Sequence, residues 1–205
     1  MDINEPWYHE IQKLFGFEFA IKAGYFKEDK DFNFNYYDNF ELPNNKIVIQ
    51  MSGAFHPFHK GHFEIAMSAY NKLIADGYLS KDIVLVIHED HDTYKKSKGD
   101  YNKSNDYSLI KNHITTFVVT ESSIDNNCSR NFTRLYSELL INNKKVYFLC
   151  GGDRANFSLS FLHKGNCIVS GRDDSENYNK YKNLKGIIFI DGNNPISSSN
   201  IRCNI

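Results

Sequence analysis

The stretch SGAFHPFHKGH (Ser52–His62) follows directly on the apolar run Ile47–Ile49 and precedes a segment with helical spacing. It holds three of the eight histidines of the chain, together with two glycines and a proline. His59 and His62 are three residues apart in what we expect to be the first turn of a helix, so their side chains project on the same side. The stretch therefore predicts a strand, a tight connection and a helix start that carries two imidazoles.

Such a helix start attracts anions, because its first backbone N–H groups lack intrahelical partners and the helix dipole is positive there. Gly53 and Gly61 remove Cβ atoms where a ligand would approach, and Pro57 stiffens the connection. Imidazoles at this point suit a polyphosphate, since they can donate hydrogen bonds to charge that develops on a phosphoryl oxygen. Two alternatives stay open: a zinc site with His56 as the nearest third ligand, and a purely structural cluster.

From residue 46 onward, short apolar runs alternate with segments of helical spacing. Apolar residues three and four apart predict helices at 62–76, 131–142 and 153–163. The apolar runs are rich in β-branched residues and are expected to be buried strands, at 47–51, 82–88, 115–120, 146–150, 166–170 and 186–190. Strands that alternate with helices predict an α/β fold with a parallel sheet, whose ligands bind beyond the carboxyl ends of the strands.

The first 45 residues differ from the remainder in their density of aromatic side chains. This composition is too apolar for a disordered tail, and we expect residues 1–45 to form an extension packed on a domain that spans 46–205. Ordinary core packing is the simplest role for these aromatics, and contact with a second subunit is the alternative. The lysine-rich segment 90–106 is expected to be a polar loop over the site.

The composition argues against several classes of protein. A chain of 205 residues with a formal net charge of −1 gives no reason to expect a nucleic acid or a membrane surface as partner. Its four cysteines show no Cys-x-x-Cys spacing, which is typical of reduced thiols in a cytosol. We expect no signal peptide and no membrane span, and hence a cytoplasmic protein. The abundance of Asn, Lys and Tyr is typical of an AT-rich genome, and a viral source would place the protein in the host cytoplasm.

Two motifs resemble the signatures of the nucleotidyltransferase superfamily, whose members join a nucleotide to a phosphate and release pyrophosphate. The first, GAFHPFHKGH at 53–62, is similar to G-x-F-x-P-x-H-x-G-H. The second, ISSSNIR at 196–202, is similar to I-S-S-[ST]-x-I-R, and the two follow in the family's order. The resemblance implies the nucleotidyltransferase fold, an α/β, Rossmann-like, doubly wound parallel sheet of five or six strands.

Residue chemistry also suggests a role for the second motif. Its serines offer hydroxyls and a helix N-cap, and Arg202 lies four residues beyond Ser198 on one helical face. Hydroxyls, exposed N–H groups and a guanidinium together suit the β- and γ-phosphates of ATP. An ordinary capped helix with a solvated Arg202 is the alternative.

Three further stretches resemble nicotinamide and nicotinate mononucleotide adenylyltransferases. YFLCGGDRANF (147–157) is similar to their L-C-G-A-D segment, and DTYKKSKG (92–99) to their D-A-Y-K-K-K-G segment. SGRDDSENY (170–178) is similar to the segment in which an arginine precedes the last core strand. The implied activity is transfer of AMP from ATP to the phosphate of a pyridine mononucleotide, with Mg²⁺ on the triphosphate. The choice between the amide and the acid mononucleotide, and the oligomeric state, stay open.

The resemblance assigns roles to particular residues of this chain. The catalytic residues that it implies are His59, His62 and Arg202. The ATP-binding residues that it implies are Gly53, Ala54, Phe55, His59, His62, Gly151, Asp153, Ser197, Ser198, Ser199 and Arg202. The acceptor-binding residues that it implies are Ser52, Gly53, His56, Tyr94, Lys95, Lys96, Gly152 and Arg172. No metal ligand on the protein is implied.

The chemistry expected of these residues is direct in-line attack of the acceptor phosphate on the α-phosphorus of ATP. A phosphate nucleophile is already anionic and needs no general base, so catalysis would consist of positioning and charge stabilisation.

Two departures from the family bear on the acceptor. Position 56 is usually Asp or Asn in these enzymes and is His here. No aromatic residue follows the third strand at 120–125, where a Trp often stacks on the pyridine ring, and Trp7 is our candidate for that platform. The alternatives are a pantetheine-phosphate adenylyltransferase, a cytidylyltransferase, or a non-catalytic nucleotide-binding module.

Overall fold

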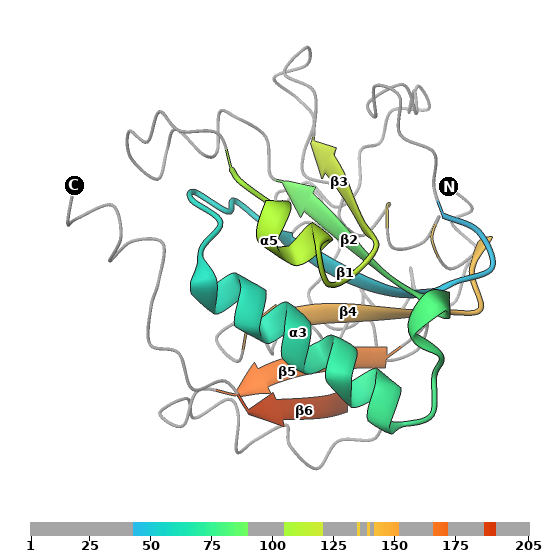
Figure 1. Ribbon diagram of the computed structural model, residues 1–205. Coiled ribbons are helices and arrows are strands. Elements are labelled where there is room, and N and C mark those ends of the chain that lie inside the picture. The colour runs from blue at the N-terminus through green and yellow to red at the C-terminus, as the bar shows by residue number, and fades with distance from the viewer. Residues whose placement is uncertain are drawn as a thin grey trace, which may run out of the picture.

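A computed structural model describes residues 43–89, 105–120, 135, 139, 142–151, 166–171 and 187–191 (Figure 1). In this part of the chain six parallel strands form one sheet, with helices beside it. The strands are β1 (Ile47–Gly53), β2 (Ile83–Glu89), β3 (Thr116–Thr120), β4 (Lys145–Gly151), β5 (Asn166–Gly171) and β6 (Ile187–Asp191). The helical elements are α3 (Lys60–Ala75), the 3₁₀ turn η1 (Ser80–Asp82) and α5 (Ser108–Lys111). The predicted α/β fold with a parallel sheet is confirmed.

The order of the strands across the sheet is β3-β2-β1-β4-β5-β6, and all neighbours are parallel. The chain thus moves outward from β1 to β3, returns to the other side of β1, and moves outward again from β4 to β6. The direction reverses between β1 and β4, where Met51 pairs with Leu149. In open parallel sheets, ligands bind beyond the carboxyl ends of the strands at such a reversal.

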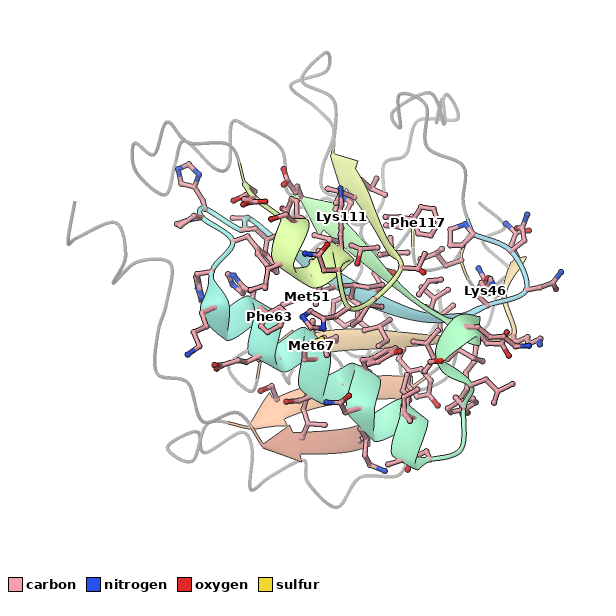
Figure 2. The ribbon with its side chains drawn as sticks, viewed as in Figure 1. Lys46, Met51, Phe63, Met67, Lys111 and Phe117 are labelled. Atoms are coloured by element: carbon pink, nitrogen blue, oxygen red, sulfur yellow. The ribbon has the colours of Figure 1, made fainter. Side chains whose placement is uncertain are left out.

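Helix α3 covers one face of the sheet (Figure 1). Its apolar residues recur three and four positions apart, so they form one stripe against the strands. Ile49 and Met51 of β1 share a buried cluster with Leu73 of α3, and Phe63 and Met67 pack against it (Figure 2). The helix ends in a Schellman arrangement, in which the N–H groups of residues 77 and 78 donate to the carbonyls of residues 74 and 73. Gly77 takes the left-handed conformation that this ending requires, with φ of +96°.

The opposite face of the sheet is buried as well. Val48 of β1, Val86 of β2 and Phe148 of β4 belong to a second cluster together with Leu135 and Leu139. Both leucines have helical backbone and no exposed surface. Because both faces of the strands are covered, their sequences are continuous apolar runs instead of alternating apolar and polar residues.

Most of the predicted elements are found within one or two residues of their predicted bounds. Helix α3 begins at Lys60, two residues before the predicted start, because His59 caps it. Of the predicted helix 131–142, the structure describes residues 135, 139 and 142, all helical. The predicted helix 153–163 and the predicted extension up to residue 42 lie outside the described residues.

Two further findings on the described residues concern membrane spans and disulfides. Among the residues that the structure describes, no helix has both the length and the hydropathy of a bilayer span. The two cysteines within these ranges, Cys150 and Cys167, form no disulfide.

Candidate functional site

The connection between β1 and α3, residues Ala54–His59, lies at the carboxyl edge of the sheet beside the reversal of strand order. Phe55 takes a left-handed backbone conformation with φ of +43°, which is uncommon for a residue with a side chain. Its ring is buried and folds back over Gly53, where an added Cβ would lie 3.5 Å from the Phe55 Cζ atom. Such conformations persist where the surrounding packing enforces them, and they are concentrated at functional sites.

The side chains of two histidines, His59 and His62, accept hydrogen bonds from backbone N–H groups at the start of α3. His59 is the N-cap residue, and its Nδ1 atom accepts a hydrogen bond from the backbone N–H of Gly61 at 3.1 Å. The Nδ1 atom of His62 accepts one from the backbone N–H of His59 at 3.2 Å. This is the reciprocal arrangement of a capping box, with imidazoles in place of the usual hydroxyl and carboxylate.

The cap also determines where each imidazole carries its proton. A ring nitrogen that accepts a hydrogen bond has no hydrogen, so each neutral ring is protonated on Nε2. The two rings are stacked, with centroids 3.8 Å apart and planes inclined by 28°. Protonation of either ring would turn its Nδ1 into a donor and remove that half of the cap. In its neutral form each ring therefore carries its proton on Nε2, and the Nε2 atom of His59 is buried.

Two phenylalanines fix the orientation of the His62 ring. The ring of Phe55 meets it edge-on, with centroids 5.1 Å apart and planes at 88°. The ring of Phe58 lies at 5.4 Å and is tilted by 30°. Since both rings belong to the connection itself, the imidazole is held by packing before any ligand binds.

A buried carboxylate lies beside this connection, at the carboxyl end of β2. Glu89 is 6% exposed and is paired with Gly53 across the two strands. Its Oε1 atom accepts a hydrogen bond from Asn105 Nδ2 at 3.0 Å and another from the Tyr107 hydroxyl. Burial foremost, and then the charge of Glu89, raise the pKa of Tyr107 far above its ordinary value, so this hydroxyl keeps its proton and donates.

Glu89, Asn105 and Tyr107 are absent from the site predicted from the sequence. One signal could have identified Glu89, because it is a carboxylate that follows directly on an apolar strand. Asn105 and Tyr107 carry no comparable signal, since a polar loop and a short helix supply many such residues.

Two strands on one side of β1 also end in glycine at the same edge of the sheet. Strand β4 ends at Gly151 and β5 at Gly171, and Gly151 pairs with Ser170. Gly151, a predicted ATP-binding residue, therefore lies at the same edge of the sheet as Gly53. A backbone without Cβ atoms allows close approach of a ligand at this edge.

The structure brings together part of the predicted site. One connection and the residues that flank it hold Ser52, Gly53, Ala54, Phe55, His56, His59 and His62, and Gly151 lies at the same edge of the sheet. The other predicted residues lie outside the described part of the chain: Trp7, Tyr94, Lys95, Lys96, Gly152, Asp153, Arg172, Ser197, Ser198, Ser199 and Arg202. The meeting of the motifs at 53–62 and 196–202 therefore stays a prediction.

A zinc site is not assembled by the residues that the structure describes. Within those ranges no three His, Cys, Asp or Glu side chains are grouped so that they could hold a metal ion. His59 and His62 instead use their Nδ1 atoms to cap the helix.

Comparison with known proteins returns no match, either to a protein-family model or to a curated protein. The function of the chain is therefore inferred from the geometry of the β1–α3 connection and from the chemistry of its residues.

Proposed function

We propose that the protein is a nucleotidyltransferase that moves AMP from ATP to the phosphate of nicotinamide or nicotinate mononucleotide and releases pyrophosphate. The observation that carries this proposal is the start of α3, where two stacked imidazoles accept backbone hydrogen bonds through Nδ1 at the reversal of strand order. The strand order also agrees with a Rossmann-like doubly wound sheet, the fold of this superfamily. The resemblance of the motifs at 53–62 and 196–202 to the superfamily signatures supports the same conclusion.

A phosphoryl group fits this helix start for two independent reasons. The positive end of the α3 dipole attracts negative charge over the first turn. The Nε2–H donor of His62 would stabilise the charge that builds up on the oxygens of the α-phosphorus during transfer, and His59, whose Nε2 atom is buried, would have to expose that atom to do the same. Because packing and the capping box already orient both rings, little reorganisation is required as the reaction proceeds.

The remaining roles follow from the resemblance and from position in the sheet. Gly53, Ala54 and Phe55 would lie along the phosphates of ATP, and Gly151 and Asp153 along its nucleoside. Ser197, Ser198, Ser199 and Arg202 would hold the β- and γ-phosphates, and Lys95 or Lys96 the acceptor phosphate. Mg²⁺ would be bound by the triphosphate and water and would neutralise phosphate charge.

The test is a pyrophosphate-release assay on the purified full chain. ATP would be supplied with nicotinamide mononucleotide, nicotinate mononucleotide or phosphopantetheine, and CTP with phosphorylated alcohol acceptors. We expect turnover with ATP and at least one of the two pyridine mononucleotides. Turnover only with phosphopantetheine or only with CTP would overturn the substrate assignment and retain the transferase class.

A calorimetric titration with ATP separates binding from catalysis. If ATP binds and none of these acceptors gives pyrophosphate, the protein is a nucleotide-binding module and the catalytic proposal is wrong. The replacement of the usual Asp or Asn by His56 would then be the first explanation to test for the missing activity.

A further inference from the structure

Glu89 and Tyr107, which are buried, and Asn105, which is half-buried, form a hydrogen-bonded cluster that is connected to the segment carrying His59 and His62. Taking a carboxylate out of water is costly, and apolar residues of similar shape would often serve stability equally well. Here the carboxylate oxygen instead receives two donors, one from Asn105 and one from Tyr107. We therefore infer that this cluster has a function in addition to stabilising the fold.

Asn105 links this carboxylate to the β1–α3 connection. Its Nδ2 atom donates to Glu89 at 3.0 Å, while its Oδ1 atom accepts a hydrogen bond from the backbone N–H of Phe58 at 2.7 Å. Only one orientation of the amide satisfies both neighbours, because a carboxylate requires a donor and an N–H group requires an acceptor. Glu89 thereby determines which end of the Asn105 amide is presented to Phe58.

Phe58 in turn contacts the ring of His62. The centroid of its ring lies 4.9 Å from that of the Tyr107 ring and 5.4 Å from that of the His62 ring. Its backbone is held by Asn105, and the following residue, His59, is the N-cap of α3. The same cluster also joins the two ends of segment 90–104, since the chain leaves at Glu89 and returns at Asn105.

We propose that Glu89 is a positioning residue for the transfer reaction: through Asn105 it holds Phe58, and through Phe58 it holds the ring of His62. This inference rests on the proposed function, because His62 is the group whose position matters. Glu89 itself does not touch the reacting atoms.

A matched pair of variants tests the inference. Asn105→Ala and Tyr107→Phe each remove one of the two donors to Glu89, but only Asn105→Ala cuts the hydrogen bond to Phe58. We expect kcat to fall about 10-fold or more in Asn105→Ala with the KM for ATP little changed, since small misplacements of catalytic groups are costly. We expect kcat of Tyr107→Phe to stay within about threefold of the wild type. Equal losses of kcat in the two variants would overturn the proposal.

Glu89→Gln supplies a conservative rescue. The Gln carbonyl can accept both hydrogen bonds in place of the carboxylate oxygen, so positioning predicts near-normal kcat in this variant and a loss in Glu89→Ala. If Glu89→Gln loses as much activity as Glu89→Ala, the carboxylate acts by its charge, and the positioning role is wrong.

The effect must also pass through His62. In a His62→Gln background, Asn105→Ala should cause no further loss of kcat, because the ring that it positions is gone. Additive losses would contradict the inference.

Imidazole ¹⁵N–¹H spectra of the resting protein provide a readout that does not depend on activity. Asn105→Ala should alter the His62 ring signals or populate a second tautomer, whereas Tyr107→Phe should leave the Nε2–H tautomer in place. If the wild type is inactive but these spectra behave as stated, the proposed function fails and the positioning of His62 stands. If the spectra of Asn105→Ala match those of the wild type, the positioning fails.

Discussion

At the scale of single residues, the site depends on which nitrogen of each histidine carries the proton. The sequence shows two imidazoles three residues apart, but their tautomers follow from backbone contacts that only the fold supplies. The backbone N–H groups of Gly61 and His59 donate to the two Nδ1 atoms, so each neutral ring carries its proton on Nε2, which is buried in His59. One helix cap therefore serves both stability and the proposed chemistry.

Gly53→Ala tests how closely a ligand approaches the end of β1. The new methyl group would meet the Phe55 ring at 3.5 Å, an ordinary contact, and we expect the free energy of unfolding to change by less than about 0.5 kcal/mol. If phosphates lie against this backbone, the affinity for ATP should fall about tenfold, equivalent to roughly 1.4 kcal/mol. Thermal unfolding and calorimetry would be run on the same sample, and unchanged affinity would show that ATP does not contact Gly53.

The raised pKa of Tyr107 leads us to expect a loss of stability at high pH. Its pKa is raised in the folded protein, so the folded state favours the protonated hydroxyl. Once the pH passes the ordinary tyrosine pKa of about 10, the unfolded chain loses this proton and the folded state does not. The free energy of unfolding should therefore decrease as the pH rises above about 10, and less steeply in Tyr107→Phe than in the wild type. Parallel pH profiles from urea titrations of the two proteins would contradict this.

At the scale of secondary-structure elements, two sets of hydrogen bonds fix the ends of elements: the cap at the start of α3, at the carboxyl edge of the sheet, and a tie ahead of β4, at its amino edge. Asn143 provides the tie. Its Nδ2 atom donates to the carbonyls of Pro43 at 2.8 Å and Leu139 at 2.9 Å, and its Oδ1 atom accepts from Lys46 N–H at 2.9 Å. The two central strands of the sheet, β1 and β4, are thereby joined ahead of their first residues.

Variants of His59 separate its capping role from the role of its imidazole. Asn is among the best N-cap residues, whereas Ala caps poorly, at a cost of about 1 kcal/mol. We expect His59→Asn to unfold at the wild-type urea concentration and His59→Ala to unfold earlier. Both should lose turnover, since both lack the ring. Normal turnover in His59→Asn would assign His59 to the cap alone.

Asn143→Ala should destabilise the protein by about 2 kcal/mol, because one truncation removes three partly buried hydrogen bonds. Lys144→Ala is the matched control, since the neighbouring side chain is exposed and its loss should cost less than about 0.5 kcal/mol. Urea unfolding followed by circular dichroism measures both. Similar stabilities of the two variants would show that the hydrogen bonds of Asn143 do not stabilise the fold.

At the scale of the whole molecule, the fold could be predicted well because its signal is local. All seven residues of strand β2 are buried, and its first five are apolar, as expected where both faces of the sheet are covered. The apolar spacing of α3 predicts this helix equally well. The predicted start differs from the observed one by two residues, because a histidine is an unusual N-cap.

The site was predictable only where its residues adjoin in sequence. The connection from Ser52 to His62 is one such segment, and it was identified. Glu89 and Asn105 lie 16 residues apart, and their link to Phe58 spans 47 residues, so no spacing rule could have joined them. The left-handed backbone of Phe55 was equally hidden, because nothing in its side chain favours that conformation.

The most direct test of the central claim is the rate of pyrophosphate release by His62→Gln compared with the wild type. Glutamine at this position can accept the hydrogen bond of a capping box, so the helix start should remain folded while the imidazole is lost. If His62 stabilises charge on the transferring phosphoryl group, turnover should fall about 100-fold with an unchanged unfolding midpoint. Turnover within about threefold of the wild type in this variant would show that the imidazole pair is structural and that the proposed chemistry is wrong.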